Sequence, residues 1–162
     1  MVMSKFAALS LTALSLTALS LTALSLTALI LIALVLNLDP LTSDMKRDSL
    51  FLLAPGFVDN GQREYCPECA ELWGLLSYFP SIKDSVDVCY QPISRPRPEI
   101  QRLLGEQNQN CPSLVLAATS PEFGACGIQL YQGLRFIDNA KDIGLYYAQR
   151  FGTPVPRGYH GA

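Results

Sequence analysis

The 162-residue chain has little histidine, little tryptophan and almost no net charge. Its single histidine is His160, close to the C-terminus, so a Cys–His hydrolase or a histidine-containing metal site is not expected. Twelve Lys and Arg residues against fourteen Asp and Glu residues give a net charge of −2, and no arginine-rich patch stands out. The chain therefore lacks the basic field with which proteins bind DNA or RNA, and we expect no nucleic-acid partner.

The chain also lacks a second CxxC motif. Its first two cysteines form Cys66-Pro67-Glu68-Cys69, whereas Cys89, Cys111 and Cys126 stand alone. Structural zinc sites usually take four ligands from two such pairs, so we expect no metal, with structural zinc left as an alternative. Cys89 alternates with valines and is expected to be a small core residue. Cys126 lies in a Gly-containing loop and is expected to be incidental.

Residues 1–44 form an apolar, low-complexity segment. The pentapeptide Ser-Leu-Thr-Ala-Leu occurs four times in succession from Ser10 to Leu29. A period of five spreads the hydroxyl groups over every face of a helix, and on a strand each copy changes sides. The segment therefore has no single apolar face to pack on a core.

Three interpretations of this segment stay open. Residues 6–36 are uncharged and long enough for a transmembrane helix. Alternatively, the repeat is an expansion of the reading frame upstream of a natural start at Met45. A cleaved signal peptide is the third interpretation, although its apolar region is usually only about 7–15 residues long. We expect a cytoplasmic protein if translation starts at Met45, and a membrane-anchored one if residues 6–36 are translated and inserted.

Residues 45–152 are expected to form one small domain, followed by an unpacked Pro/Gly-rich tail at 153–162. Apolar runs and alternation predict strands at 49–53, 86–90, 113–117 and 134–137. Helical spacing with Pro, Gly and Asn end signals predicts helices at 66–79, 98–104 and 139–151. The order βαβαββα makes a βαβ unit followed by a hairpin and a last helix. It predicts an α/β fold with a mixed central sheet and helices on both faces.

The CxxC motif falls between the first strand and the first helix. Pro67 suits the first helical position, because the N–H that it lacks would be unpaired there. Cys66 is then the N-cap, and the free N–H groups of the first turn point toward its sulfur and favour a reactive thiolate. Cys69 lies one turn further in. Residues at helical spacing place one apolar face along Cys69, Trp73, Leu76 and Phe79.

The element order and the CxxC at the first helix resemble the thioredoxin/glutaredoxin superfamily. More closely, the chain is similar to a bacterial thioredoxin-like family known as domain of unknown function 3088. The matching segments are Arg47–Phe57, Arg95–Arg97, Leu104–Gln109 and Phe151–Pro156. The resemblance covers nearly all of residues 45–162 and none of the repeat.

The resemblance implies roles for individual residues. Cys66 becomes the attacking thiol, Cys69 the resolving thiol, and Pro112 a cis-proline that faces them. Cys111 takes the position beside the substrate where Thr or Val is more usual. Pro67 and Glu68 would contact substrate within the motif. The start of the last helix, at Asn139, would receive a glutathione carboxylate.

The sequence thus predicts a thiol–disulfide oxidoreductase that works by dithiol exchange. No cofactor is required, glutathione can serve as the reductant, and the partner is a protein disulfide or glutathione itself. The Glu68 carboxylate opposes negative charge on Cys66 and favours a reducing couple. Two alternatives stay open: a redox-inert binding module and a glutathione-linked transferase-like protein. Arg95 and Arg97 are expected to be solvated.

Overall fold

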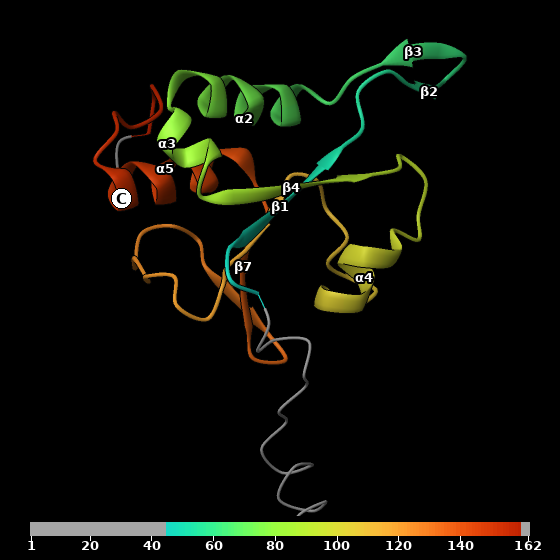
Figure 1. Cartoon of the computed structure of the whole chain (residues 1–162). Helices are drawn as coiled ribbons and strands as arrows, with labels where there is room; N and C mark the ends of the chain where they lie inside the picture. The colour runs from blue at the N-terminus through green and yellow to red at the C-terminus, as the bar shows by residue number, and fades with distance from the viewer. Residues whose placement is uncertain (1–44, 160–162) are drawn as a thin grey trace, which may run out of the picture. The chain divides into compact units, whose positions relative to one another are not determined.

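The computed structural model describes residues 45–159 (Figure 1). The predicted repeat, its candidate membrane span at 6–36 and His160 lie outside the described residues. Within 45–159, none of the helices has both the length and the apolar character that a membrane crossing requires.

A five-stranded mixed sheet forms the centre of the domain. In chain order its strands are β1 (Asp48–Leu53), β4 (Val86–Gln91), β5 (Ser113–Val115), β6 (Gln129–Tyr131) and β7 (Leu134–Ile137). Their spatial order is β4-β1-β5-β7-β6. The β1 and β4 strands are parallel, while β5 runs antiparallel to β1 and β7 runs antiparallel to both β5 and β6. The predicted mixed sheet is confirmed.

Four helices cover this sheet. They are α2 (Pro67–Tyr78), α3 (Pro80–Lys83), α4 (Pro98–Leu104) and α5 (Ala140–Phe151). The α2, α3 and α5 helices contact one another on one side of the sheet, and α4 lies apart from them on the other side (Figure 1). This arrangement confirms the predicted α/β class and is consistent with a thioredoxin-like fold.

The central strand β1 is covered on both faces, which explains its unbroken apolar run. Leu50 and Leu52 are completely buried, and Phe51, which points to the opposite face, is only 2% exposed. A strand with helices on both sides is expected to read as continuously hydrophobic rather than alternating. This run positions the ends of β1, which carry the groups described below.

The segment between the first predicted strand and the CxxC motif, for which we predicted neither a strand nor a helix, contains a hairpin. Strands β2 (Phe57–Asp59) and β3 (Gln62–Glu64) pair antiparallel around Asn60 and Gly61. These two residues have φ values of 48° and 75°, the left-handed pair that a two-residue hairpin turn of type I′ requires. The Asn-Gly dipeptide was the available signal for this turn. The hairpin projects away from the main sheet and leads back to the CxxC motif (Figure 1).

The prediction of an unpacked tail is wrong for its described part. Pro156 lies so close to Gly144 of α5 that a Cβ atom at this glycine would come within 2.8 Å of the proline Cγ. The Tyr159 hydroxyl also donates a hydrogen bond to the Asp142 carboxylate. The tail packs because Gly144 provides a flat site on α5 for a proline ring.

The buried face of α2 also differs in part from the prediction. Cys66 caps the helix and Pro67 is its first residue, as predicted. Its buried residues are Cys69, Leu72 and Leu76, whereas Trp73 is only partly buried. Trp73 instead packs along the side of the helix, where it reaches a surface cavity.

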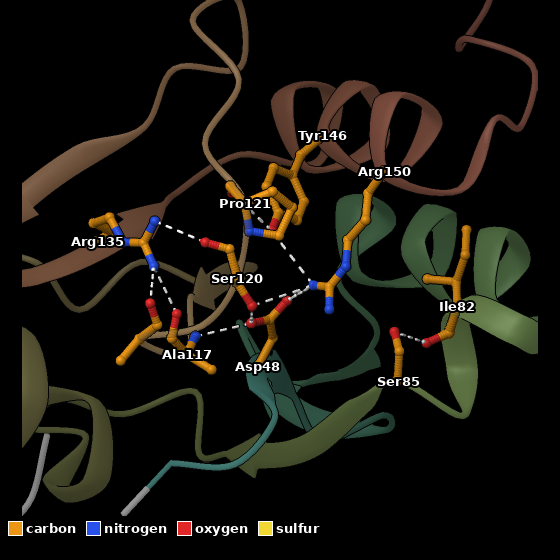
Figure 2. A network of polar contacts seen from close by, with 10 residues as sticks. Asp48, Ile82, Ser85, Ala117, Ser120, Pro121, Arg135, Tyr146 and Arg150 are labelled. Carbon is orange, nitrogen blue, oxygen red and sulfur yellow. Dashed lines mark hydrogen bonds and ion pairs between the residues drawn. The ribbon is translucent and has the colours of Figure 1, made fainter. Parts of the chain in front are cut away.

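A buried polar network fixes the N-terminal end of β1 (Figure 2). The Asp48 carboxylate has no exposed surface and accepts hydrogen bonds from the Ala117 backbone N–H at 2.8 Å and the Ser120 hydroxyl at 2.5 Å. It also pairs with the Arg150 guanidinium of α5. Arg135 donates to the backbone oxygens of Ala117 and Ser120. The network therefore ties β1 to α5 through the segment that follows β5.

Candidate thiol site

Cys66 lies at the N-terminus of α2, where the chain returns from the β2–β3 hairpin. Its extended backbone (φ −79°, ψ 116°) suits an N-cap residue, and its sulfur accepts a hydrogen bond from the Cys69 backbone N–H at 3.2 Å. The residue is half-buried and lines a cavity at the surface. This is a suitable position for a nucleophile, because N–H groups at a helix N-terminus stabilise negative charge.

Cys69 lies in the first turn of α2 and is only 4% exposed. Its sulfur accepts a hydrogen bond from the Leu53 backbone N–H, at the end of β1, at 3.4 Å. Burial raises the pKa of Cys69 to about 12; hydrogen bonding with Cys66 and the charges of Cys66 and Cys111 act in the same direction, and the Leu53 N–H acts against them. At neutral pH this thiol is therefore protonated while Cys66 is free.

Cys111 brings a third sulfur to the same place. The Cys66 thiol donates to the Cys111 backbone oxygen at 3.9 Å, although 45 positions separate the two residues. Cys111 is 7% exposed, and its peptide bond to Pro112 is cis, as the resemblance implied. Burial raises the pKa of Cys111 to about 11, while Arg97 and Arg95 act in the opposite direction. The fold thus gathers Cys66, Cys69 and Cys111 from two distant segments.

An apolar surface cavity of about 290 Å³ opens beside the two CxxC sulfurs. Its walls are formed by Leu53, Pro55, Tyr65, Cys66, Cys69, Ala70 and Trp73. None of these side chains is charged. Trp73 stacks against Tyr90 with ring centroids 6.5 Å apart, and Tyr65 is 66% exposed at the rim. The cavity can therefore receive an uncharged, apolar group next to the Cys66 sulfur.

The other predicted site residues fall into two groups. Pro67 and the exposed Glu68 occupy the first turn of α2, next to Cys66. Asn139 is the N-cap of α5: its Oδ1 accepts from the Asp142 backbone N–H at 2.8 Å, and its Nδ2 donates to the Asp142 carboxylate at 2.8 Å. Both polar atoms of Asn139 are engaged within their own helix end, and the residue does not line the cavity at Cys66.

Arg97 is buried rather than solvated, which corrects the prediction, while Arg95 is exposed as expected. The Arg97 guanidinium donates to the backbone oxygens of Pro92 at 2.9 Å, Ile93 at 3.0 Å and Gln109. Its backbone N–H donates to the Gln109 side chain at 2.7 Å. A run of alternating Arg and Pro gives no sign of this burial, because it depends on the distant segment that leads to Cys111.

The remaining cysteines do not line the cavity beside Cys66. Cys89 packs at the margin of the core and is half-buried. Cys126 is completely buried and accepts a hydrogen bond from Gln149 at 3.3 Å, so it is a core residue rather than the incidental loop residue that we expected. In the part of the chain that the structure describes, no group of three or more His, Cys, Asp or Glu residues is arranged to hold a metal ion.

The fold and the site together define an α/β domain with a mixed central sheet and a CxxC motif at the start of its first long helix. Residues 47–155 match a family model whose description is "Protein of unknown function (DUF3088)". The chain belongs to this family, as its sequence motifs indicated. No match was found among curated proteins or among solved structures.

Proposed function

We propose that the protein is a thiol–disulfide oxidoreductase of the thioredoxin/glutaredoxin type. The observation that carries this proposal is the asymmetry of the CxxC pair. Cys66 caps a helix and keeps solvent contact, whereas Cys69 is buried directly behind it with its N–H bonded to the Cys66 sulfur. An accessible nucleophile with a protected second thiol is the arrangement that dithiol exchange needs.

The reaction proceeds in two exchanges. The Cys66 thiolate attacks one sulfur of a substrate disulfide, forms a mixed disulfide and releases the first substrate thiolate. Cys69 then loses its proton and attacks the Cys66 sulfur, which closes the Cys66–Cys69 disulfide and releases the second thiolate. The substrate gains two electrons from the two cysteines, and an external thiol returns the pair to its reduced form.

The surroundings of Cys69 support this order of events. Part of the rise in its pKa comes from its hydrogen bond with Cys66 and from the Cys66 charge. The charge contribution ends when Cys66 enters a mixed disulfide, because its sulfur then carries no negative charge, whereas burial, the largest cause of the rise, remains. The pKa of Cys69 falls at that step, while its hydrogen bond from Leu53 remains. Formation of the mixed disulfide therefore makes Cys69 easier to deprotonate than it is beside the Cys66 thiolate.

The proposed partner is a protein disulfide or glutathione, with glutathione or another thiol as the reductant and no cofactor. The uncharged cavity at Tyr65 and Trp73 favours a polypeptide disulfide that carries an apolar neighbour. Glu68 in the first turn of α2 opposes negative charge near Cys66 and favours the reducing direction. The proposed compartment is accordingly the cytoplasm, where thiols are kept reduced.

The test is turnover of a model protein disulfide by the full chain, with dithiothreitol as the electron source. We expect Cys66→Ser to lose the turnover and Cys89→Ser to retain it, because Cys89 does not line the cavity. A Cys69→Ser/Cys111→Ser double variant should accumulate a covalent adduct between Cys66 and the substrate. If the unmodified chain is no faster than the background, or if Cys66→Ser turns over equally well, the site is a redox-inert binding surface.

A further inference from the structure

Three thiols converge at this site, whereas the exchange just described uses two. The Cys66 thiol contacts the Cys111 backbone oxygen at 3.9 Å. Cys69 and Cys111 both belong to the buried core, and the half-buried Cys66 packs against it. A disulfide needs Cα atoms roughly 4.4–6.8 Å apart. The contact between the Cys66 sulfur and the Cys111 backbone oxygen makes the two residues direct neighbours, which such a bond requires.

Arg97 places a buried positive charge beside this third thiol. The residue is 5% exposed, and the described contacts of its guanidinium are all with backbone oxygens. Within residues 45–159 no carboxylate forms an ion pair with it. A guanidinium cannot lose its proton in a protein. Its charge is therefore available to stabilise an anion nearby.

The Cys111 thiolate is the anion that the Arg97 charge stabilises. Gln109, two residues earlier, holds Arg97 through both its backbone oxygen and its side chain. Arg97 and the exposed Arg95 both favour the Cys111 thiolate, against its burial and the charge of Cys66. Among residues 45–159, no cation favours the Cys69 thiolate in this way. Of the two buried thiols that we describe beside Cys66, Cys111 is the one whose thiolate is favoured by positively charged side chains.

We propose that Cys111 is a third redox thiol of this site, able to close a disulfide with Cys66 in place of Cys69, and that Arg97 is the positioning residue that favours its thiolate. The inference rests on the proposed function, since it requires Cys66 to form a mixed disulfide first. The Cys111 thiolate attacks the Cys66 sulfur of that intermediate, the Cys66–Cys111 bond forms, and the bound substrate leaves as a thiolate. Two protein thiols are oxidised and one substrate disulfide is reduced.

The test uses the full chain with Cys89→Ser as background and the aromatic disulfide 5,5′-dithiobis(2-nitrobenzoate) as substrate. Each half of this probe absorbs visible light when it is released. With Cys69→Ala added, we expect release of both halves and a Cys66–Cys111 crosslink in the peptide map. With Cys69→Ala/Cys111→Ala, only the first half should be released, and the second should stay on Cys66.

The two proposals fail in different ways in this experiment. If Cys66 does not react with the probe in any variant, the dithiol function itself is wrong. If Cys66 reacts but the Cys69→Ala variant keeps the second half of the probe on Cys66, the dithiol function stands and the role of Cys111 is wrong.

The role of Arg97 is tested by its charge. In the Cys69→Ala background, Arg97→Met should slow release of the second half about tenfold and move its pH profile upward, since one pKa unit changes the thiolate fraction tenfold. Arg97→Lys, which keeps the charge, should restore most of the rate. If Arg97→Met does not fold, Arg95→Ala at the exposed neighbour should give a smaller slowing in the same direction. A second release with an unchanged pH profile in these variants contradicts the role assigned to Arg97.

Discussion

The two ends of strand β1 differ in the hydrogen-bond partners of their buried polar groups. At its first residue, the Asp48 carboxylate is fully buried and matched by a backbone N–H, a hydroxyl and the Arg150 guanidinium. At its last residue, the Leu53 N–H donates a hydrogen bond to the Cys69 sulfur at 3.4 Å. The first end carries strong, charge-assisted hydrogen bonds between side chains, whereas the side-chain partner at the other end is a weakly accepting sulfur.

This difference separates what holds the fold from what can react. Charged groups that hydrogen-bond to one another have no free donor or acceptor with which to bind a substrate. We therefore interpret the Asp48 end as structural. The thiols at the other end carry protons that they can lose and a neighbouring cation, Arg97, that no described carboxylate neutralises. Reactivity is expected where the polar groups are incompletely matched.

Removal of the Asp48 carboxylate is expected to give the largest loss of stability. Asp48→Ala leaves Arg150 without its partner and the Ala117 N–H unsatisfied, so we expect the free energy of unfolding to fall by about 3–5 kcal/mol. The matched control is Asp87→Ala, which removes an exposed ion pair with Arg47 and should cost less than about 1 kcal/mol. Urea denaturation measures both variants. Equal losses would show that the Asp48 end is not the stabilising one.

Much of the fold could be predicted from the sequence, because its signals are local. The N-cap at Cys66 and the helices predicted at 98–104 and 139–151 depend on end signals within one turn, and the structure confirms them. Asp48 was missed as a buried anchor because its partner Arg150 is 102 positions away. No local pattern records such a pairing.

The candidate site was predictable only in part. The CxxC motif located Cys66 and Cys69, and the resemblance pointed to Cys111 and Pro112. The burial of Arg97 was missed because it depends on Gln109, which lies beyond α4. The packing of the tail was missed for a similar reason, since its Pro and Gly content suggests an open chain until Gly144 is seen beneath Pro156.

Alkaline pH is expected to destabilise the fold at the thiol end of β1. The pKa of Cys69 in the folded state, about 12, lies above its ordinary value of 9.0. The stability that comes from keeping this thiol neutral is therefore complete below pH 9 and is lost as the pH rises toward 12. We expect the free energy of unfolding to fall more steeply over this range in the unmodified chain than in Cys69→Ala. Parallel curves for the two proteins would contradict the burial of this thiol.

The cavity beside Cys66 gives the smallest expected effect and separates substrate binding from folding. Tyr65→Ala removes an exposed wall of this cavity, so we expect KM for a polypeptide disulfide to rise by up to about tenfold, or 1.4 kcal/mol, with kcat unchanged. Tyr78→Ala is the matched control. Tyr78 is exposed like Tyr65, but it lies at the end of α2 and lines a different cavity. Steady-state kinetics measure both. If the two variants raise KM equally, the cavity at Tyr65 is not the substrate site.

The redox equilibrium of the CxxC pair decides whether the proposed dithiol function is correct. The full chain is equilibrated in a series of glutathione buffers, its thiols are alkylated, and each cysteine is quantified by peptide mass. We predict that Cys66 and Cys69 become protected together, in one two-electron transition that disappears in Cys66→Ser, while Cys126 stays reduced in its buried position. If Cys66 and Cys69 both remain open to alkylation in the most oxidising buffer, the pair is not a redox dithiol. The proposed thiol–disulfide oxidoreductase function is then wrong.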